Sequence, residues 1–117
     1  MIDSAEALEL AIELHRRGDL AAAAAAYRRA EIAGQPMAAF NLGVLLYEAS
    51  DFDGAERAWW RCLEHSEARA VAATNLGFLF EKRGDLPGAQ KAYLAAARWG
   101  DPTGQAMADR LSAAAKP

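Results

Sequence analysis

The chain has 117 residues, 53% hydrophobic and 25% charged, a balance typical of one globular domain and unlike that of a disordered segment. Its net charge is only −3 and no basic stripe occurs, which argues against nucleic-acid binding. The single cysteine, Cys62, excludes an internal disulfide and fits a reducing compartment. The acidic N-terminus lacks signal-peptide features, and the longest alanine run, residues 21–26, is too short for a membrane span, so we expect a cytoplasmic protein without a membrane role.

Alanine accounts for 30 residues, while valine, isoleucine and threonine are scarce and no segment alternates apolar and polar residues. Because alanine is the strongest helix former and lets helices approach closely, this composition predicts an all-α fold without a sheet. Hydrophobic spacing places the helices in chain order near residues 4–17, 20–33, 36–49, 53–65, 67–82, 86–99 and 102–114.

Helix boundaries are marked by capping and breaking residues. Asp3 and Glu6 have the spacing of a capping box for the first helix. The boundary between the two helices of a repeat is marked by a helix-breaking residue, followed by an aspartate that can cap the second helix: Gly18, Ser50–Asp51 and Gly84–Asp85. The end of a second helix is marked by a glycine, followed by a proline that can open the next helix: Gly34 with Pro36, and Gly100 with Pro102.

An internal repeat is the most informative feature. Residues 38–46 (AAFNLGVLL) align without gaps with residues 72–80 (AATNLGFLF), which places Gly43 and Gly77 34 positions apart. A weaker upstream copy matches through Gly-Asp-Leu at 18–20 and 84–86, each followed by an alanine and a tyrosine at the same offsets. The recurring small and large positions are Ala39, Leu42, Leu46, Ala55 and Trp59, then Ala73, Leu76, Phe80, Ala89 and Tyr93, and in the weaker copy Ala7, Leu10, Ala11, Leu14, Ala23 and Tyr27.

This pattern resembles the tetratricopeptide repeat (TPR) family, whose period is 34 residues. The shorter first spacing, with Ala-Gly-Gln-Pro at 33–36, is also similar to SEL-type repeats. The resemblance implies a right-handed α-solenoid in a single domain, 1–117, with repeats at about 4–35, 36–66 and 67–101 and a capping helix at 102–114. The chain departs from the family in having alanine in place of its first tryptophan, and repeat one lacks the glycine.

Glycine inside a helix costs about 1 kcal/mol relative to alanine, so Gly43 and Gly77 predict close packing against the partner helix of the same repeat. The large residues of the second helices, Tyr27, Trp59 and Tyr93, are expected to fill the space between neighbouring repeats. In the capping helix, Met107 and Leu111 are expected to cover Trp99 and the open end of repeat three, leaving a polar outer face.

No enzyme motif is present, and the sequence predicts no catalytic residue, cofactor or metal. His15 and His65 are isolated from other ligand-type residues and are expected to be solvated near helix ends. Cys62 takes the place of a small core residue and is expected to be a buried, inert thiol.

In TPR-like proteins the first helices of the repeats line a concave groove. The resemblance implies that the following residues face it here: Leu8, Glu9, Ile12, His15, Arg16, Met37, Phe40, Asn41, Val44, Tyr47, Glu48, Val71, Thr74, Asn75, Phe78, Glu81 and Lys82. The candidate partner-binding residues among them are Leu8, Ile12, Met37, Phe40, Asn41, Val44, Tyr47, Thr74, Asn75, Phe78 and Lys82. The alternative for any one of them is packing against an adjacent first helix. Some TPR-like proteins bind acidic C-terminal tails with a carboxylate clamp of lysine, arginine and asparagine. Asn41 and Asn75 resemble the clamp asparagine, but the places of the lysines and arginines are filled here by Leu8, Ile12, Thr74 and Phe78. An apolar or amphipathic protein or peptide partner is therefore favoured.

Two hypotheses for function result. The first is a module that binds a protein or peptide partner in the groove. The second is a scaffold that self-associates as a homo-oligomer through Trp60, because Trp59 and Trp60 point about 100° apart on a helix and both cannot face one core. The alternative for Trp60 is partial burial against a neighbouring second helix.

Overall fold

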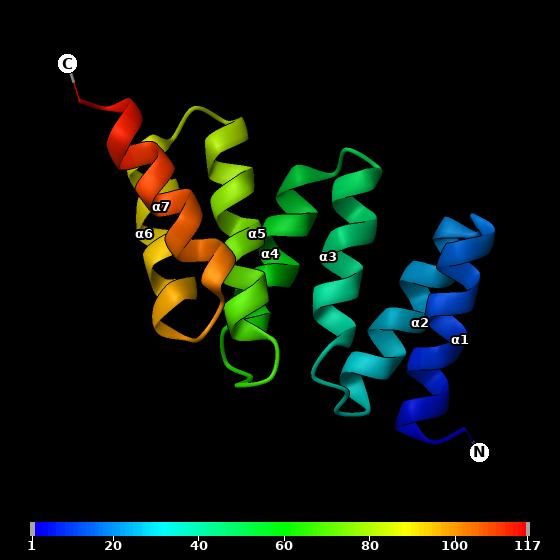
Figure 1. Ribbon diagram of the computed structural model, residues 1–117. Coiled ribbons are helices and arrows are strands. Elements are labelled where there is room, and N and C mark those ends of the chain that lie inside the picture. Colours follow the sequence, from blue (N-terminus) through cyan, green and yellow to red (C-terminus); the bar gives the residue numbers. More distant parts are fainter. Residues whose placement is uncertain (1, 117) are drawn as a thin grey trace. The chain divides into compact units, whose positions relative to one another are not determined.

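The computed structural model describes residues 2–116, and within this range the chain forms seven helices and no strand (Figure 1). The helices are α1 (Ser4–Arg17), α2 (Leu20–Ile32), α3 (Ala38–Glu48), α4 (Phe52–Cys62), α5 (Arg69–Lys82), α6 (Leu86–Arg98) and α7 (Pro102–Ala114). The all-α prediction is confirmed. Most boundaries differ from the predicted ones by at most two residues, but α4 ends three residues early, and Pro36 does not open α3, which begins two residues later.

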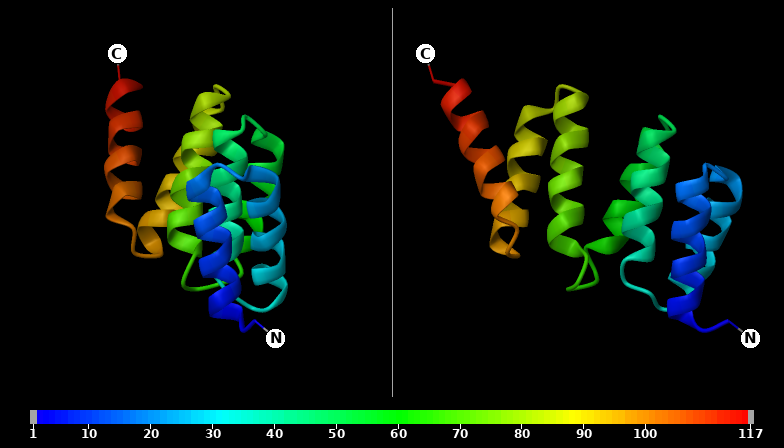
Figure 2. Two further views of the ribbon diagram at one scale, coloured as in Figure 1. Left: turned by 90° about the vertical axis from the view of Figure 1, so that its right-hand side faces the viewer. Right: turned by 45° about the vertical axis from the view of Figure 1, so that its right-hand side comes forward.

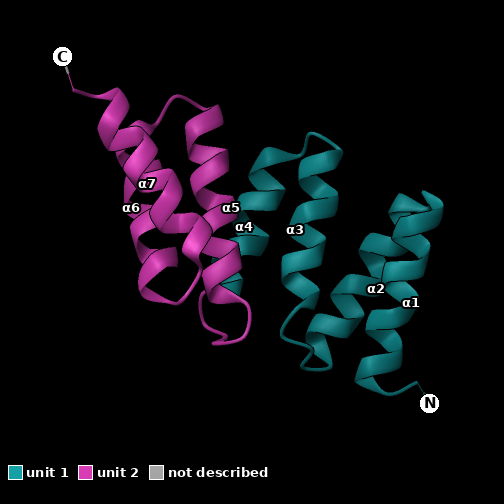
Figure 3. Cartoon of the chain, in the orientation of Figure 1, with its two compact units in different colours: residues 1–62 teal, residues 63–117 magenta. Residues whose placement is uncertain are grey.

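The chain divides into two compact units, residues 1–62 with α1 to α4 and residues 63–117 with α5 to α7 (Figure 3). Within each unit, consecutive helices run antiparallel and pack as helix-turn-helix pairs (Figures 1 and 2). The assignment of the whole chain to one domain stays a prediction. No helix within residues 2–116 has the length and apolar character that crossing a bilayer requires.

The core of unit 1 consists mainly of alanines around one tyrosine, which is why its helices approach so closely. Tyr27 is buried together with Leu42 and Leu45 of α3. The alanines of this core come from three helices: Ala11 from α1, Ala23, Ala24 and Ala26 from α2, and Ala58 from α4. Burial of the three large side chains contributes about 1.5–3 kcal/mol each to the driving force for folding.

The core of unit 2 surrounds Tyr93 of α6, with Ala89 and Ala108 buried beside it. Met107 and Leu111 of α7 pack against this cluster, as expected for a helix that covers α6. The expected cover of Trp99 by these two residues stays a prediction, and the guanidinium of Arg69 lies 5.1 Å from the centre of its indole ring. Trp99 is thus held by a cation–π contact with α5.

Gly43 of α3 and Gly77 of α5 each lie under an aromatic ring of the same repeat. A Cβ atom at Gly43 would overlap the indole of Trp59, and a Cβ atom at Gly77 would overlap the ring of Tyr93. The Trp59 indole also donates a hydrogen bond of 3.1 Å to the carbonyl oxygen of Phe40. The predicted close packing is confirmed. The rings of Trp59 and Tyr93 contact the partner helix of their own repeat, and Tyr27 and Tyr93 also share a core with the helix that follows their repeat, α3 and α7.

The turns between first and second helices share a left-handed residue, with φ of 84° at Gly18, 63° at Ser50 and 80° at Gly84. The aspartate that follows caps the next helix in two of the three cases: the N–H of Gly54 donates to Asp51 (3.0 Å), and the N–H of Gly88 donates to Asp85 (2.9 Å).

Asp19 makes no such bond, so the predicted cap is wrong for α2. Ala22 stands in α2 at the position of Gly54 and Gly88. A side chain at this position does not by itself exclude a cap, because the N–H of Glu6 donates to Asp3 at 2.8 Å in α1.

Candidate partner-binding surfaces

In unit 1 the predicted site residues of repeat two lie along α3. Phe40, Asn41 and Val44 are half-buried, as is Met37 just before the helix. Tyr47 differs from them, because its ring packs on those of Phe52 (centroids 5.2 Å apart) and Trp59 (5.9 Å). We define the α3 surface as Met37, Phe40, Asn41 and Val44, and assign Tyr47 to the packing of α3 on α4.

In unit 2 the equivalent residues lie along α5. Phe78 is 39% exposed although one edge of its ring rests on Tyr93, with centroids 5.6 Å apart. Val71 and Lys82 are exposed, and Asn75 is half-buried. We define the α5 surface as Val71, Asn75 and Phe78.

Thr74, also predicted to face a ligand, is buried, with 3% of its surface exposed. Its hydroxyl donates to the carboxylate of Asp101 at 2.6 Å and lies 3.3 Å from the carbonyl oxygen of Ala70. The second oxygen of Asp101 accepts a hydrogen bond from the N–H of Thr103 and so caps α7. Thr74 therefore holds the start of α7 and is removed from the candidate site.

Leu8 and Ile12 of α1 are partly buried and pack against the core of unit 1. This packing matches the alternative considered for the groove residues, in which a side chain contacts a neighbouring helix. We do not count Leu8 and Ile12 in the candidate site, because these side chains already pack against the core of unit 1.

The two asparagines occupy the same position of successive repeats, 34 residues apart. Neither side-chain amide makes a hydrogen bond to any residue within 2–116. Asn41 lies beside Met37 and Val44 at helical spacing, and Asn75 lies similarly beside Val71 and Phe78. Each surface thus combines a free amide, able to donate and to accept, with apolar side chains that are half-buried on α3 and exposed on α5.

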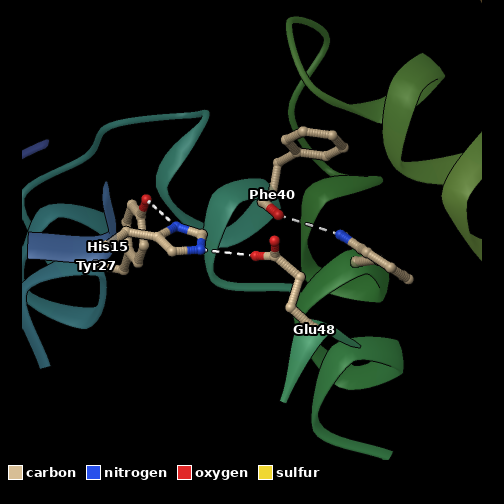
Figure 4. A network of polar contacts seen from close by, with 5 residues as sticks. His15, Tyr27, Phe40 and Glu48 are labelled. Atoms are coloured by element: carbon tan, nitrogen blue, oxygen red, sulfur yellow. Dashed lines mark hydrogen bonds and ion pairs between the residues drawn. The ribbon is translucent and has the colours of Figure 1, made fainter. Parts of the chain in front are cut away.

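His15 is not the solvated histidine that the sequence predicts. One ring nitrogen, Nδ1, lies 2.9 Å from the hydroxyl of Tyr27, and the other, Nε2, lies 2.7 Å from the carboxylate of Glu48 (Figure 4). The imidazole and phenol rings meet edge to face with centroids 5.7 Å apart. His15 therefore links α1 to both α2 and α3, and neither His15 nor Glu48 is left over for a ligand.

Unit 2 has a junction of the same form with different chemistry. The Tyr93 hydroxyl donates to Glu81 of α5 at 2.8 Å, and Arg110 of α7 donates to the same carboxylate. The hydrogen bond from Arg110, followed by that from Tyr93, lowers the pKa of Glu81. Burial, together with this bond to Glu81, raises the pKa of Tyr93, so the phenol stays protonated. Sequence reasoning missed both junctions.

The two adjacent tryptophans of α4 face different surroundings. Trp59 is 2% exposed, whereas Trp60 is 50% exposed and its indole N–H donates to Glu56 at 3.0 Å. The expectation that both rings cannot face one core is confirmed.

The remaining candidate groups show no site. Cys62 is fully buried, and this burial raises the pKa of its thiol to about 12, which agrees with the expected inert thiol. His65 is exposed in the segment between α4 and α5. Among residues 2–116, no three histidine, cysteine or acidic side chains gather closely enough to hold a metal ion.

No protein-family model matches this chain, and no curated protein is significantly similar to it. The functional assignment therefore depends on the internal repeat and on the side chains described above.

Proposed function

We propose that this chain is a TPR-like repeat protein, a right-handed solenoid of three repeats with α7 as the cap, that binds an apolar or amphipathic segment of a partner protein. The 34-residue spacing of Gly43 and Gly77 supports the repeat assignment, because each glycine lies under an aromatic ring of its own repeat. The α3 and α5 surfaces are the two binding subsites.

The observation that carries this proposal is the pair of asparagines without an intramolecular partner. A half-buried amide that the fold does not use is stabilised when a ligand supplies a donor and an acceptor, and a peptide backbone offers both. Asn41 and Asn75 recur at one repeat position, whereas the polar residues His15 and Glu81 at a different position are fully used by the fold.

The neighbours of the asparagines indicate the character of the ligand. Val71 and Phe78 on α5 are exposed, and Phe40 and Val44 on α3 are half-buried, while arginine is absent from both surfaces. The carboxylates of an acidic tail would therefore have no guanidinium group to bind on either surface. A segment that presents apolar side chains at helical or extended spacing, together with backbone groups for the asparagines, suits these residues better.

The test is a selection of binding peptides from a phage-displayed random library with the purified protein, followed by affinity measurements on the selected peptides. We expect enrichment of apolar peptides, and loss of binding by at least tenfold in Phe78→Glu and in the double variant Asn41→Ala/Asn75→Ala. Circular dichroism checks that helicity is retained, because Phe78 also touches Tyr93.

A matched control is available on α2. Ile32 is 87% exposed and belongs to neither surface, so Ile32→Glu makes the same apolar-to-acidic change and should bind as the wild type does. If Phe78→Glu and the double asparagine variant also bound every selected peptide at full affinity, the α3 and α5 surfaces would not be the binding site.

Self-association is a second candidate, favoured by the exposed ring of Trp60. An exposed tryptophan on an otherwise polar helix surface is a common anchor of protein interfaces. Light scattering across a concentration series of wild type and Trp60→Ser decides it: a mass that rises with concentration only in the wild type supports the scaffold, and a constant monomer mass in both removes it.

A further inference from the structure

A polar pocket of about 200 Å³ lies in unit 1, away from the α3 surface. Its lining includes three arginines, Arg28 from α2 with Arg57 and Arg61 from α4, and two leucines of α3, Leu42 and Leu46. Asp51 and Gly54, at the start of α4, complete the lining. One water molecule requires about 10–15 Å³ measured in this way, so the pocket has room for a tetrahedral oxyanion.

Two of the three arginines are not used by the fold. Arg61 is held by Glu31 of α2 through two hydrogen bonds, of 2.7 and 3.1 Å. Arg28 and Arg57 make no hydrogen bond or ion pair with any residue within 2–116. Two unpaired guanidinium groups that line one pocket repel each other, and a bound anion would relieve this repulsion.

The paired contact between Glu31 and Arg61 links α2 to α4, the two helices that supply the arginines of the pocket. The single carboxylate in the lining, Asp51, is already engaged with the N–H of Gly54 as the cap of α4. The Asp51 carboxylate thus caps the N-terminal end of α4, and the arginines are the groups available to a ligand.

The arginines are not required by the repeat. The residues that correspond to Arg28 in repeats two and three are Trp60 and Leu94, and those that correspond to Arg57 in repeats one and three are Ala25 and Lys91. Helix packing therefore tolerates uncharged side chains at the Arg28 position and an alanine at the Arg57 position.

We propose that this pocket binds a compact oxyanion, a phosphate or carboxylate group, through Arg28 and Arg57, with Arg61 completing the cluster. Guanidinium groups bind both kinds of oxyanion through paired hydrogen bonds, and the surface that lines this pocket is almost entirely polar. This site is separate from the α3 and α5 surfaces and does not depend on the function proposed for them.

The test is a titration of the full chain with sodium phosphate, sodium acetate and sodium chloride at equal ionic strength, observed by NMR at the arginine side-chain N–H groups. Saturable shifts at Arg28 and Arg57 with an oxyanion, and none with chloride, are expected. Stronger binding of phosphate than of acetate identifies a phosphate source, whereas equal or stronger binding of acetate identifies a carboxylate source.

Variants separate a specific site from general attraction by positive charge. Arg28→Gln/Arg57→Gln should weaken oxyanion binding at least about tenfold, while Arg29→Gln, which removes the neighbouring arginine outside the pocket, should change it less than about twofold. Arg28→Lys keeps the charge but not the paired geometry and should give an intermediate loss. Unsaturable shifts that match those with chloride, or equal losses in the Arg29 and double variants, would overturn the proposal.

Discussion

Replacing Gly43 by alanine is expected to destabilise the chain, although helix propensity alone predicts the opposite. Alanine in place of a helical glycine contributes about 1 kcal/mol of stability when the position is open to solvent. Gly43 is buried, and its added Cβ atom would overlap the indole of Trp59, which is itself 2% exposed. The ring has no free space to move into, so the geometry of the α3–α4 pair must change.

The magnitude follows from two costs and one gain. Forcing an extra carbon into a packed core costs about 1–3 kcal/mol. Moving the indole also weakens its 3.1 Å hydrogen bond to the carbonyl oxygen of Phe40, which is worth about 0.5–1.5 kcal/mol. After subtraction of the propensity gain, we expect a net loss of about 2 kcal/mol in the free energy of unfolding.

Urea unfolding followed by circular dichroism measures this loss, and the chain supplies its own control. Repeat one has Ala11 in the position of Gly43 and Tyr27 in the position of Trp59, and both are buried in one core. The variant Gly43→Ala/Trp59→Tyr recreates that pair and should lose about 1 kcal/mol less than the sum of its single changes. A Gly43→Ala protein as stable as the wild type would refute the packing argument.

Three further changes test other parts of the fold by the same urea measurement. Ser50→Gly should stabilise the chain by about 0.5–1 kcal/mol, since serine there has a left-handed φ of 63° that glycine adopts freely; a loss of stability would show that the serine side chain contributes more than its strain costs. Asp85→Ala should cost about 1 kcal/mol and Asp19→Ala less than about 0.5, because only Asp85 caps its helix; equal losses would contradict the capping geometry. The lowered pKa of Glu81 means that its contacts stabilise the fold above the ordinary carboxyl pKa and are lost as the pH falls through the lowered value, so stability should fall less steeply on acidification in Glu81→Gln than in the wild type.

The helices could be predicted from the sequence because their signals are local. Gly18, Gly84 and the aspartates beside them stand within one turn of the boundaries they set, and alanine acts on helix formation at every position it occupies. Pro36 misled the prediction because a proline is equally compatible with the turn before a helix and with its first residue. In the structure Pro36 lies in the turn, and α3 begins two residues later at Ala38.

The site residues were harder to predict, since their state depends on partners far away in the chain. His15 meets Tyr27 and Glu48, 12 and 33 residues away, and Thr74 meets Asp101, 27 residues away. Spacing along one helix contains no signal of such pairs. The arginine pocket was missed for the same reason, because Arg28 and Arg57 are distant in sequence and do not follow the repeat.

The polar junction of unit 2 also restricts how the chain can assemble wrongly. Helices that meet mainly through alanine fit one another in several combinations, so packing alone would sort similar repeats poorly during folding. If α3 docked in place of α7, Glu48 would approach the carboxylate of Glu81, and two like charges would meet where Arg110 now pairs with Glu81. This junction therefore favours α7 over α3, which makes repeat order a matter of charge as well as of connectivity.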